Sequence, residues 1–131
     1  MRREPIILDG LVFPWLHVMD IERLFNVLDT EITGRLRDGD IDRDIIGTYY
    51  NYSFDIDQDD KNPKHYDDFY DIISAPDRAH NIIVPYGQTE MEFEAYVTTG
   101  KDRLKAMLEN ENRWGDLSFN FIAKMPQRRP R

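Results

Sequence analysis

Two stretches of this chain alternate apolar and polar residues with a period of two, and this alternation constrains the fold more than any other feature. Within 45–57, the even positions from Tyr50 to Ile56 are apolar and the positions between them are polar. The same rhythm returns at Leu117, Phe119 and Phe121. Because successive side chains of a β-strand point to opposite faces, each stretch predicts a strand with one face in the core and one face in water.

Further strands are predicted on both sides of the first stretch. Apolar residues flank an Asp9–Gly10 pair between Pro5 and Pro14, which is typical of a tight hairpin. Residues 15–32 fit either a strand or a helical stripe, and we favour the strand. Residues 34–44 are polar and hold two glycines, which indicates an exposed loop or a hairpin tip. Residues 82–85 and 91–97 predict an antiparallel pair around a turn at 87–88.

Two helices are predicted, a main one over about 62–74 and a short one over about 100–109. Asn62 suits the N-cap of the main helix and Pro63 suits its first turn. The expected buried stripe of this helix consists of Tyr66, Phe69, Tyr70 and Ile73. In the short helix, the spacing of Leu104, Met107 and Leu108 suggests a second apolar stripe.

The order of these elements predicts one domain over residues 1–131, with a short basic tail at 127–131. The fold class is α+β and rich in β-strands. We expect an antiparallel sandwich or a partly closed barrel, with the aromatic main helix covering one opening.

Charge and composition exclude several classes of function. Five of the 17 basic residues lie at positions 2–3 and 128–131, which leaves 12 basic against 25 acidic residues between positions 4 and 127. Such an acidic body repels phosphate backbones, so we expect no nucleic-acid partner. The chain has no cysteine and no apolar run long enough to cross a bilayer, so we expect a cytoplasmic protein without a membrane partner.

The residues show no recognisable catalytic, cofactor-binding or metal-binding motif. Asp55, Asp57 and Asp59 have the spacing of the first ligands of a calcium loop, but Asp60 and Tyr66 stand where that loop needs Gly and Glu. A second acidic run, 38–42, fails in the same way. The three histidines are isolated, and neither GxSxG nor a phosphate loop occurs. We therefore expect no cofactor, no metal site and no catalytic residues.

Two other classes of function stay open. Tyr49 is predicted to lie alone on the outer face of its strand, and with Trp15 or Trp114 it could serve a small module that binds a carbohydrate or a peptide. The acidic loops could instead serve a metal-assisted hydrolase, which we regard as the weaker reading.

Four segments carry a resemblance to a known group of proteins, and together they cover much of the chain. They read GRLRDGDIDRDIIGTYYNYSFDI, HYDDFYDIISAP, VPYGQTEMEFEAYVTTG and RWGDLSFNFIAKMPQRRP. In these segments the chain resembles small tail-associated proteins encoded in the structural modules of tailed phages and prophages of Firmicutes.

The resemblance implies a non-enzymatic structural or tail-assembly protein, located in the bacterial cytoplasm or incorporated in the virion. Its partners would be copies of itself or neighbouring tail proteins. Charged loops can fix the register between subunits, so the expected contacts lie in the polar loop, the first strand after it and the basic tail. The candidate contact residues are Arg35, Arg37, Arg43, Tyr49, Arg128 and Arg129.

Overall fold

The computed structural model describes residues 5–14, 16–30, 34–35, 39, 41–58 and 63–130. One helix and ten strands are found among them. In chain order they are β1 (Ile7–Leu8), β2 (Leu11–Val12), β3 (Leu16–Asp29), β4 (Gly34–Arg35), β5 (Ile41–Asp42), β6 (Ile45–Gln58), α1 (Pro63–Ser74), β7 (His80–Tyr86), β8 (Thr89–Tyr96), β9 (Gly100–Leu108) and β10 (Glu111–Ala123). The predicted β-rich α+β class is confirmed.

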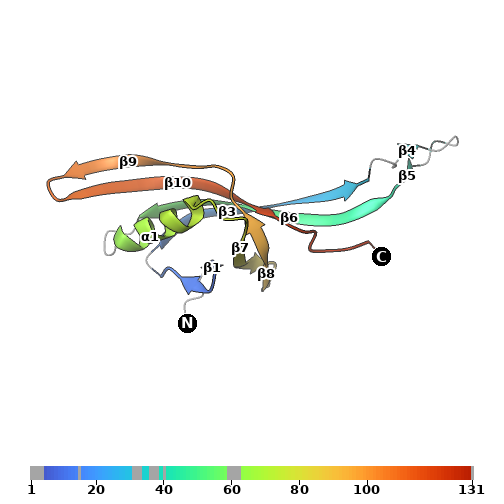
Figure 1. The fold of residues 1–131 in the computed structure, drawn as a ribbon, viewed down its shortest axis with the longest axis horizontal. Helices are drawn as coiled ribbons and strands as arrows, with labels where there is room; N and C mark the ends of the chain where they lie inside the picture. Colours follow the sequence, from blue (N-terminus) through green and yellow to red (C-terminus); the bar gives the residue numbers. More distant parts are fainter. Residues whose placement is uncertain are drawn as a thin grey trace.

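Eight of the strands form one antiparallel sheet in the order β2-β1-β7-β8-β10-β6-β3, and β9 pairs with β10 outside this path. The long strand β10 joins the two parts of the sheet. Its Leu117–Phe121 stretch pairs with β6, whereas Ile122 and Ala123 pair with β8. The sheet bends at this junction, so that the β7–β8 hairpin runs across the long strands (Figure 1). It is not closed into a barrel.

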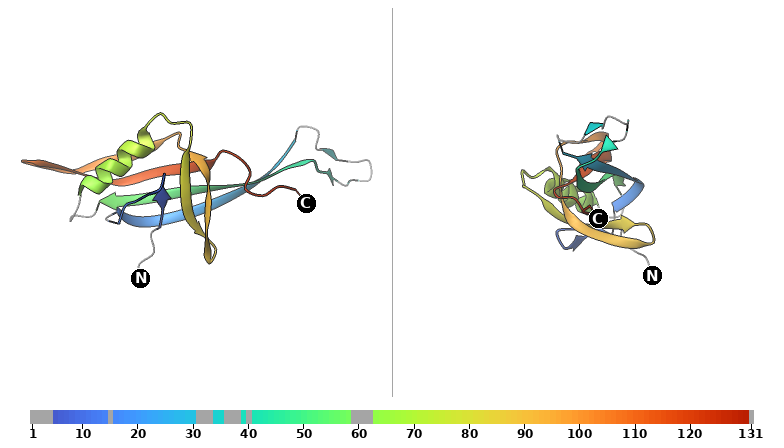
Figure 2. Two further views of the ribbon diagram at one scale, coloured as in Figure 1. Left: turned by 60° about the horizontal axis from the view of Figure 1, so that its bottom comes forward. Right: turned by 90° about the vertical axis from the view of Figure 1, so that its right-hand side faces the viewer.

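Two long hairpins extend from the body of the molecule in opposite directions (Figures 1 and 2). One, here the β3–β6 arm, comprises residues 24–29 of β3 and 45–51 of β6 and leads to the small β4–β5 pair. The other, the β9–β10 arm, comprises residues 104–108 and 111–114. The arms give the molecule an elongated outline (Figure 1).

The core lies between α1 and the face of the sheet that α1 covers. Phe119 is central to it, since its ring lies 5.7 Å from Phe54, 5.6 Å from Phe69 and 5.1 Å from Phe121, centroid to centroid. These four rings come from β6, α1 and β10. Burial of large rings is the strongest apolar contribution available to a small domain, so this cluster fixes α1 on the sheet.

The predicted alternation of β6 and β10 is confirmed, because Tyr52, Phe54, Ile56, Leu117, Phe119 and Phe121 are all buried. The predicted hairpin around Asp9 and Gly10 is confirmed as well. Both residues have positive φ, 52° and 80°, which is the geometry of the two-residue turn that joins β1 to β2. The strand interpretation of 15–32 is confirmed for 16–29, which form β3, while residues 15, 31 and 32 lie outside the described residues.

Within the polar stretch 34–44, residues 34–35 and 41–42 form the paired strands β4 and β5. The main helix is confirmed as α1, while the proposed N-cap Asn62 lies outside the described residues. Its buried residues are Tyr66, Phe69 and Ile73. Tyr70, expected in the buried stripe, is 37% exposed, because it lines a pocket that is open to solvent.

The prediction of a second helix over 100–109 is wrong. This segment is the strand β9, which pairs with β10 from Gly100↔Phe119 to Leu108↔Glu111. Leu104, Met107 and Leu108 are 41%, 74% and 52% exposed, so their helical spacing does not mark a buried stripe. The backbone N–H and C=O groups of β9 bond to β10 instead, and this tertiary pairing overrides the local pattern.

None of the helices in the described part of the chain has the length and apolar character that crossing a membrane requires.

Candidate functional site

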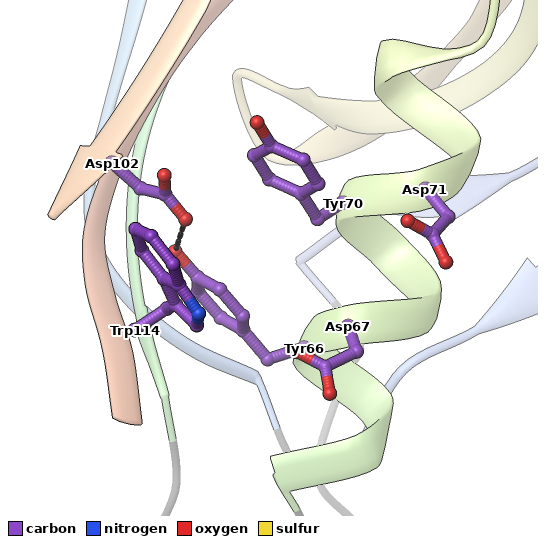
Figure 3. A pocket seen from close by; sticks show the side chains of 6 residues that line it. All are labelled: Tyr66, Asp67, Tyr70, Asp71, Asp102 and Trp114. Carbon is purple, nitrogen blue, oxygen red and sulfur yellow. Dashed lines mark hydrogen bonds between the residues drawn. The ribbon is translucent and has the colours of Figure 1, made fainter. Parts of the chain in front are cut away.

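A pocket of about 400 Å³ lies between α1 and the base of the β9–β10 arm (Figure 3). Its wall consists of aromatic and acidic side chains, namely Tyr66, Asp67, Tyr70, Asp71, Asp102 and Trp114. The pocket is open to solvent. Pockets that combine flat aromatic surface with a few polar groups are typical binding sites.

The helix supplies four of these residues in two pairs one turn apart. Tyr66 and Tyr70 are separated by four positions, as are Asp67 and Asp71, so each pair lies along one side of the helix. Asp102 comes from β9 and Trp114 from β10. These two strands are paired, with Leu104 opposite Trp114, which brings Asp102 and the indole to the same wall.

One hydrogen bond closes the floor of the pocket. The Tyr66 hydroxyl donates to Oδ2 of Asp102 over 2.9 Å, and Figure 3 shows this contact. Burial of Tyr66, followed by the nearby Asp102 carboxylate, raises the pKa of the phenol far above its ordinary value. The phenol therefore stays protonated and acts as a fixed donor that ties α1 to β9.

Electrostatically, the pocket disfavours further negative charge. Partial burial, and then the neighbouring carboxylates of Asp71, Asp68 and Asp102, raise the pKa of Asp67. A cation placed in the pocket would relieve this repulsion and could lie against the ring faces of Trp114 and Tyr70. The six lining residues include no serine, cysteine or histidine, so the arrangement favours binding over nucleophilic catalysis.

On the opposite face of the sheet, an ionic bridge holds β9 in place. Lys105 Nζ lies 3.0 Å from Oδ2 of Asp57 and 3.1 Å from Oδ1 of Asp116. To reach Asp57 on β6, the lysine crosses β10 at Gly115, where a Cβ would meet both the Asp57 carboxylate and the Lys105 side chain. The glycine thus makes room for the bridge.

The arms carry most of the exposed apolar surface. Nine of the fourteen exposed large apolar side chains found in the described residues lie on them. They are Leu24, Phe25, Val27, Leu28 and Ile46 on the β3–β6 arm, and Leu104, Met107, Leu108 and Trp114 on the β9–β10 arm. Concentrated apolar exposure of this kind marks interaction surfaces.

Among the candidate contact residues of the polar loop, the structure describes the side chain of Arg43. Arg35 belongs to β4, but its side chain is outside the described residues, as is the whole of Arg37. Arg43 pairs with Asp29 at 2.9 Å, which joins the two strands at the tip. Tyr49 is half-buried on β6.

The candidate residues of the basic tail lie at the base of the β3–β6 arm. Arg128 forms a bridge with Thr48, and the Thr48 N–H donates to the Arg128 carbonyl over 2.9 Å. Hydrogen bonds from Tyr86 and then from the Arg128 side chain lower the pKa of Tyr50. Arg129 is exposed. The structure therefore brings the described part of the tail against β6.

The acidic loops do not converge in the described part of the chain. Asp38, Asp40 and Asp59 lie outside the described residues, and no side chain is described for Asp42. Within the residues that are described, no group of three or more potential metal ligands is found. His80 is buried and its Nδ1 lies 2.8 Å from Oδ2 of Asp9, which is a structural contact between β7 and the first hairpin.

Sequence reasoning missed the pocket. Among the residues that line it, the sequence suggests binding only for Trp114, and helical spacing predicts a buried position for Tyr66 and Tyr70. The available signal was the i, i+4 repeat of both aromatic and acidic residues on one helix. The missing information was the strand at 100–108, which alone places Asp102 beside the helix. Neither a protein-family model nor a curated protein matches this sequence, so its function must be inferred from its own residues.

Proposed function

We propose that this chain is a non-enzymatic assembly protein that acts through protein–protein contacts made by its two arms. The observation that carries the proposal is the concentration of exposed apolar side chains on these arms. A monomer that works alone rarely keeps so many large apolar groups in water, whereas a subunit covers them on assembly.

The proposal extends to a structural or tail-assembly role in a phage or prophage, in the bacterial cytoplasm or in the virion. The resemblance noted in the sequence supports this extension. Its first segment covers the tip of the β3–β6 arm and most of β6, and its last segment covers most of β10. Of the exposed apolar residues on the arms, Ile46 and Trp114 lie in these segments, and the others lie on β3 and β9, which pair with the resembling strands β6 and β10.

Sedimentation velocity over a concentration series tests the arms directly. Replacing two exposed residues of each arm, as Leu24→Ser with Phe25→Ser and Met107→Ser with Leu108→Ser, should weaken self-association without unfolding the domain. The matched control is Leu11→Ser with Val12→Ser, since these residues of β2 are 51% and 50% exposed but lie off the arms. A wild-type chain that stays monomeric at every concentration would argue against self-assembly through the arms.

A second experiment addresses the basic tail. Light scattering across salt concentrations, with and without residues 128–131, reports whether these charges take part in assembly. Association that weakens with salt only when the tail is present would assign the tail a direct role. A salt-insensitive monomer in both forms would count against it.

A second candidate function is the binding of a peptide through the pocket of Figure 3. Its acidic and aromatic wall favours a basic side chain, which would lie against Trp114 between Asp67 and Asp102. Titration with an arginine-containing peptide, followed by tryptophan fluorescence, tests this. The same peptide with glutamine in place of arginine is the control. Equal responses to both peptides, or a response unchanged in Trp114→Leu, would remove this candidate.

A further inference from the structure

Four strands, β9-β10-β6-β3, form a sheet whose two outer strands lie on opposite edges. In the described part of the chain, β3 pairs with β6 and β9 pairs with β10, and each has no partner on its other side. An edge strand presents unpaired N–H and C=O groups, which makes it a template for another strand. Both edges can therefore accept a partner strand.

The outer face of the sheet, away from α1, carries acid at the β3 edge. Asp20 and Glu22 are exposed on this face. Asp20 stands directly opposite Asp55 of β6, and Glu22 stands opposite Ser53. Like charges directly opposite each other destabilise a sheet, so this edge gains from a cation beside it.

The same face carries basic side chains at the β9 edge. Lys101 and Arg103 are exposed, and they stand opposite the uncharged Ser118 and Gly115 of β10. Their neighbour Asp102 receives the Tyr66 hydrogen bond and so points toward α1, which places Lys101 and Arg103 on the outer face. The two edges are therefore complementary in charge on one face.

We propose that the β3 edge of one copy of this chain pairs antiparallel with the β9 edge of a second copy. In the register that places Glu22 opposite Arg103, Asp20 lies diagonal to Arg103 and Lys101 lies diagonal to Glu22. On the inner face the same register sets Ile21 opposite Leu104. No like charges face each other in the segment that pairs residues 21–25 with residues 100–104.

The alternative pairings are less complementary. A parallel alignment with Glu22 opposite Arg103 sets Ile21 against the Asp102 carboxylate. Two β3 edges would bring acids together, and two β9 edges would bring bases together, so the charge rows disfavour symmetric pairing. Opposite edges joined head to tail continue the sheet from copy to copy, which produces a ring if the rotation closes and a filament if it does not. This inference rests on the proposed assembly function and names its partner as a second copy.

A charge-swap experiment tests the pairing. Glu22→Arg and Arg103→Glu should each weaken self-association on the order of tenfold, because an attractive cross-strand pair becomes repulsive. The double variant, and an equimolar mixture of the two single variants, should restore it. The matched control combines Glu92→Arg on β8 with Lys64→Glu on α1, which makes the same charge changes at exposed positions off both edges.

Cysteine cross-linking provides a second measurement that does not depend on the strength of the association. The chain has no cysteine, so Ile21→Cys with Leu104→Cys introduces the only two thiols. Three strand spacings, about 14 Å, separate these edges within one copy, which is too far for an internal disulfide. Oxidation should therefore yield disulfide-linked oligomers, and Ile21→Cys with Asp102→Cys should yield fewer.

The outcomes separate the two proposals. Association that depends on the apolar arm residues but is not restored by the charge swap would leave the assembly function standing and overturn this pairing. Cross-links formed equally well by the two cysteine pairs would also overturn it. A wild-type chain that stays monomeric, together with an Ile21→Cys, Leu104→Cys variant that forms no disulfide-linked oligomers, would overturn both the pairing and self-assembly through the arms.

Discussion

Replacement of Phe119 by alanine should be among the most destabilising single truncations in the domain. Its ring is 2% exposed and packs against Phe54, Phe69 and Phe121. Truncation of a buried phenylalanine costs about 3–5 kcal/mol, since the lost burial adds to the cavity that remains. With three ring neighbours from three elements, we expect about 4 kcal/mol. That is a large part of the roughly 5–15 kcal/mol that stabilises a domain of this kind.

The matched control is Phe25→Ala, which removes the same atoms from a ring that is 66% exposed on β3. It should lower the free energy of unfolding by less than about 1 kcal/mol, because only the strand preference of phenylalanine and the small buried part of its ring are lost. Urea unfolding of both variants at low protein concentration, with equal slopes, gives the two free energies directly. Similar losses in the two variants would refute the assignment of the core to the inner face of β10.

Four further variants address the site and the ionic bridge. Tyr66→Phe should lower the unfolding free energy by about 1–2 kcal/mol, because Asp102 loses a charged hydrogen bond, and a loss near zero in urea titration would contradict the tie between α1 and β9. Gly115→Ala should lower the unfolding free energy by about 1–3 kcal/mol, because the new Cβ displaces Lys105 from Asp57. Thermal melting of Gly115→Ala, of Lys105→Met and of the double variant checks whether the two substitutions remove the same interaction. Asp67→Asn should raise the melting temperature at neutral pH, since burial and Asp71 raise the pKa of Asp67 and make its charge unfavourable in the folded state, and this gain should fade in acid, where Asp67 is protonated in both states. Asp57→Asn should do the opposite: burial works against the Asp57 charge, but Lys105 and the Gln58 N–H outweigh it and hold its pKa low, so the stabilisation present at neutral pH is lost as the pH falls through the folded-state pKa.

The helix prediction at 100–109 shows where local pattern fails. Leu104, Met107 and Leu108 have helical spacing, yet all three are exposed on a strand. Apolar spacing identifies a helix when a core exists for it to cover. Here residues 104–108 belong to the β9–β10 arm and have no core beneath them, so their strand pairing with β10 determines their conformation instead.

The pocket depends on the same tertiary pairing. The helical repeat of Tyr66 with Tyr70 and of Asp67 with Asp71 can be read in the sequence. Asp102 and Trp114 lie far from it along the chain, and their approach requires both the β9–β10 hairpin and the docking of α1 through Phe69. No spacing rule covers such a meeting of distant segments.

The sequence alone was enough to predict the strands whose side chains alternate, the first hairpin and the main helix, because periodicity and turn chemistry are local properties of the backbone. It also determined which faces of β6 and β10 are buried. The bend of the sheet at β10, its open form, the two arms and the opposite charges of the β3 and β9 edges could not be predicted from the sequence. These features depend on which strands pair across the chain, and that choice is made by the free energy of the whole packed molecule.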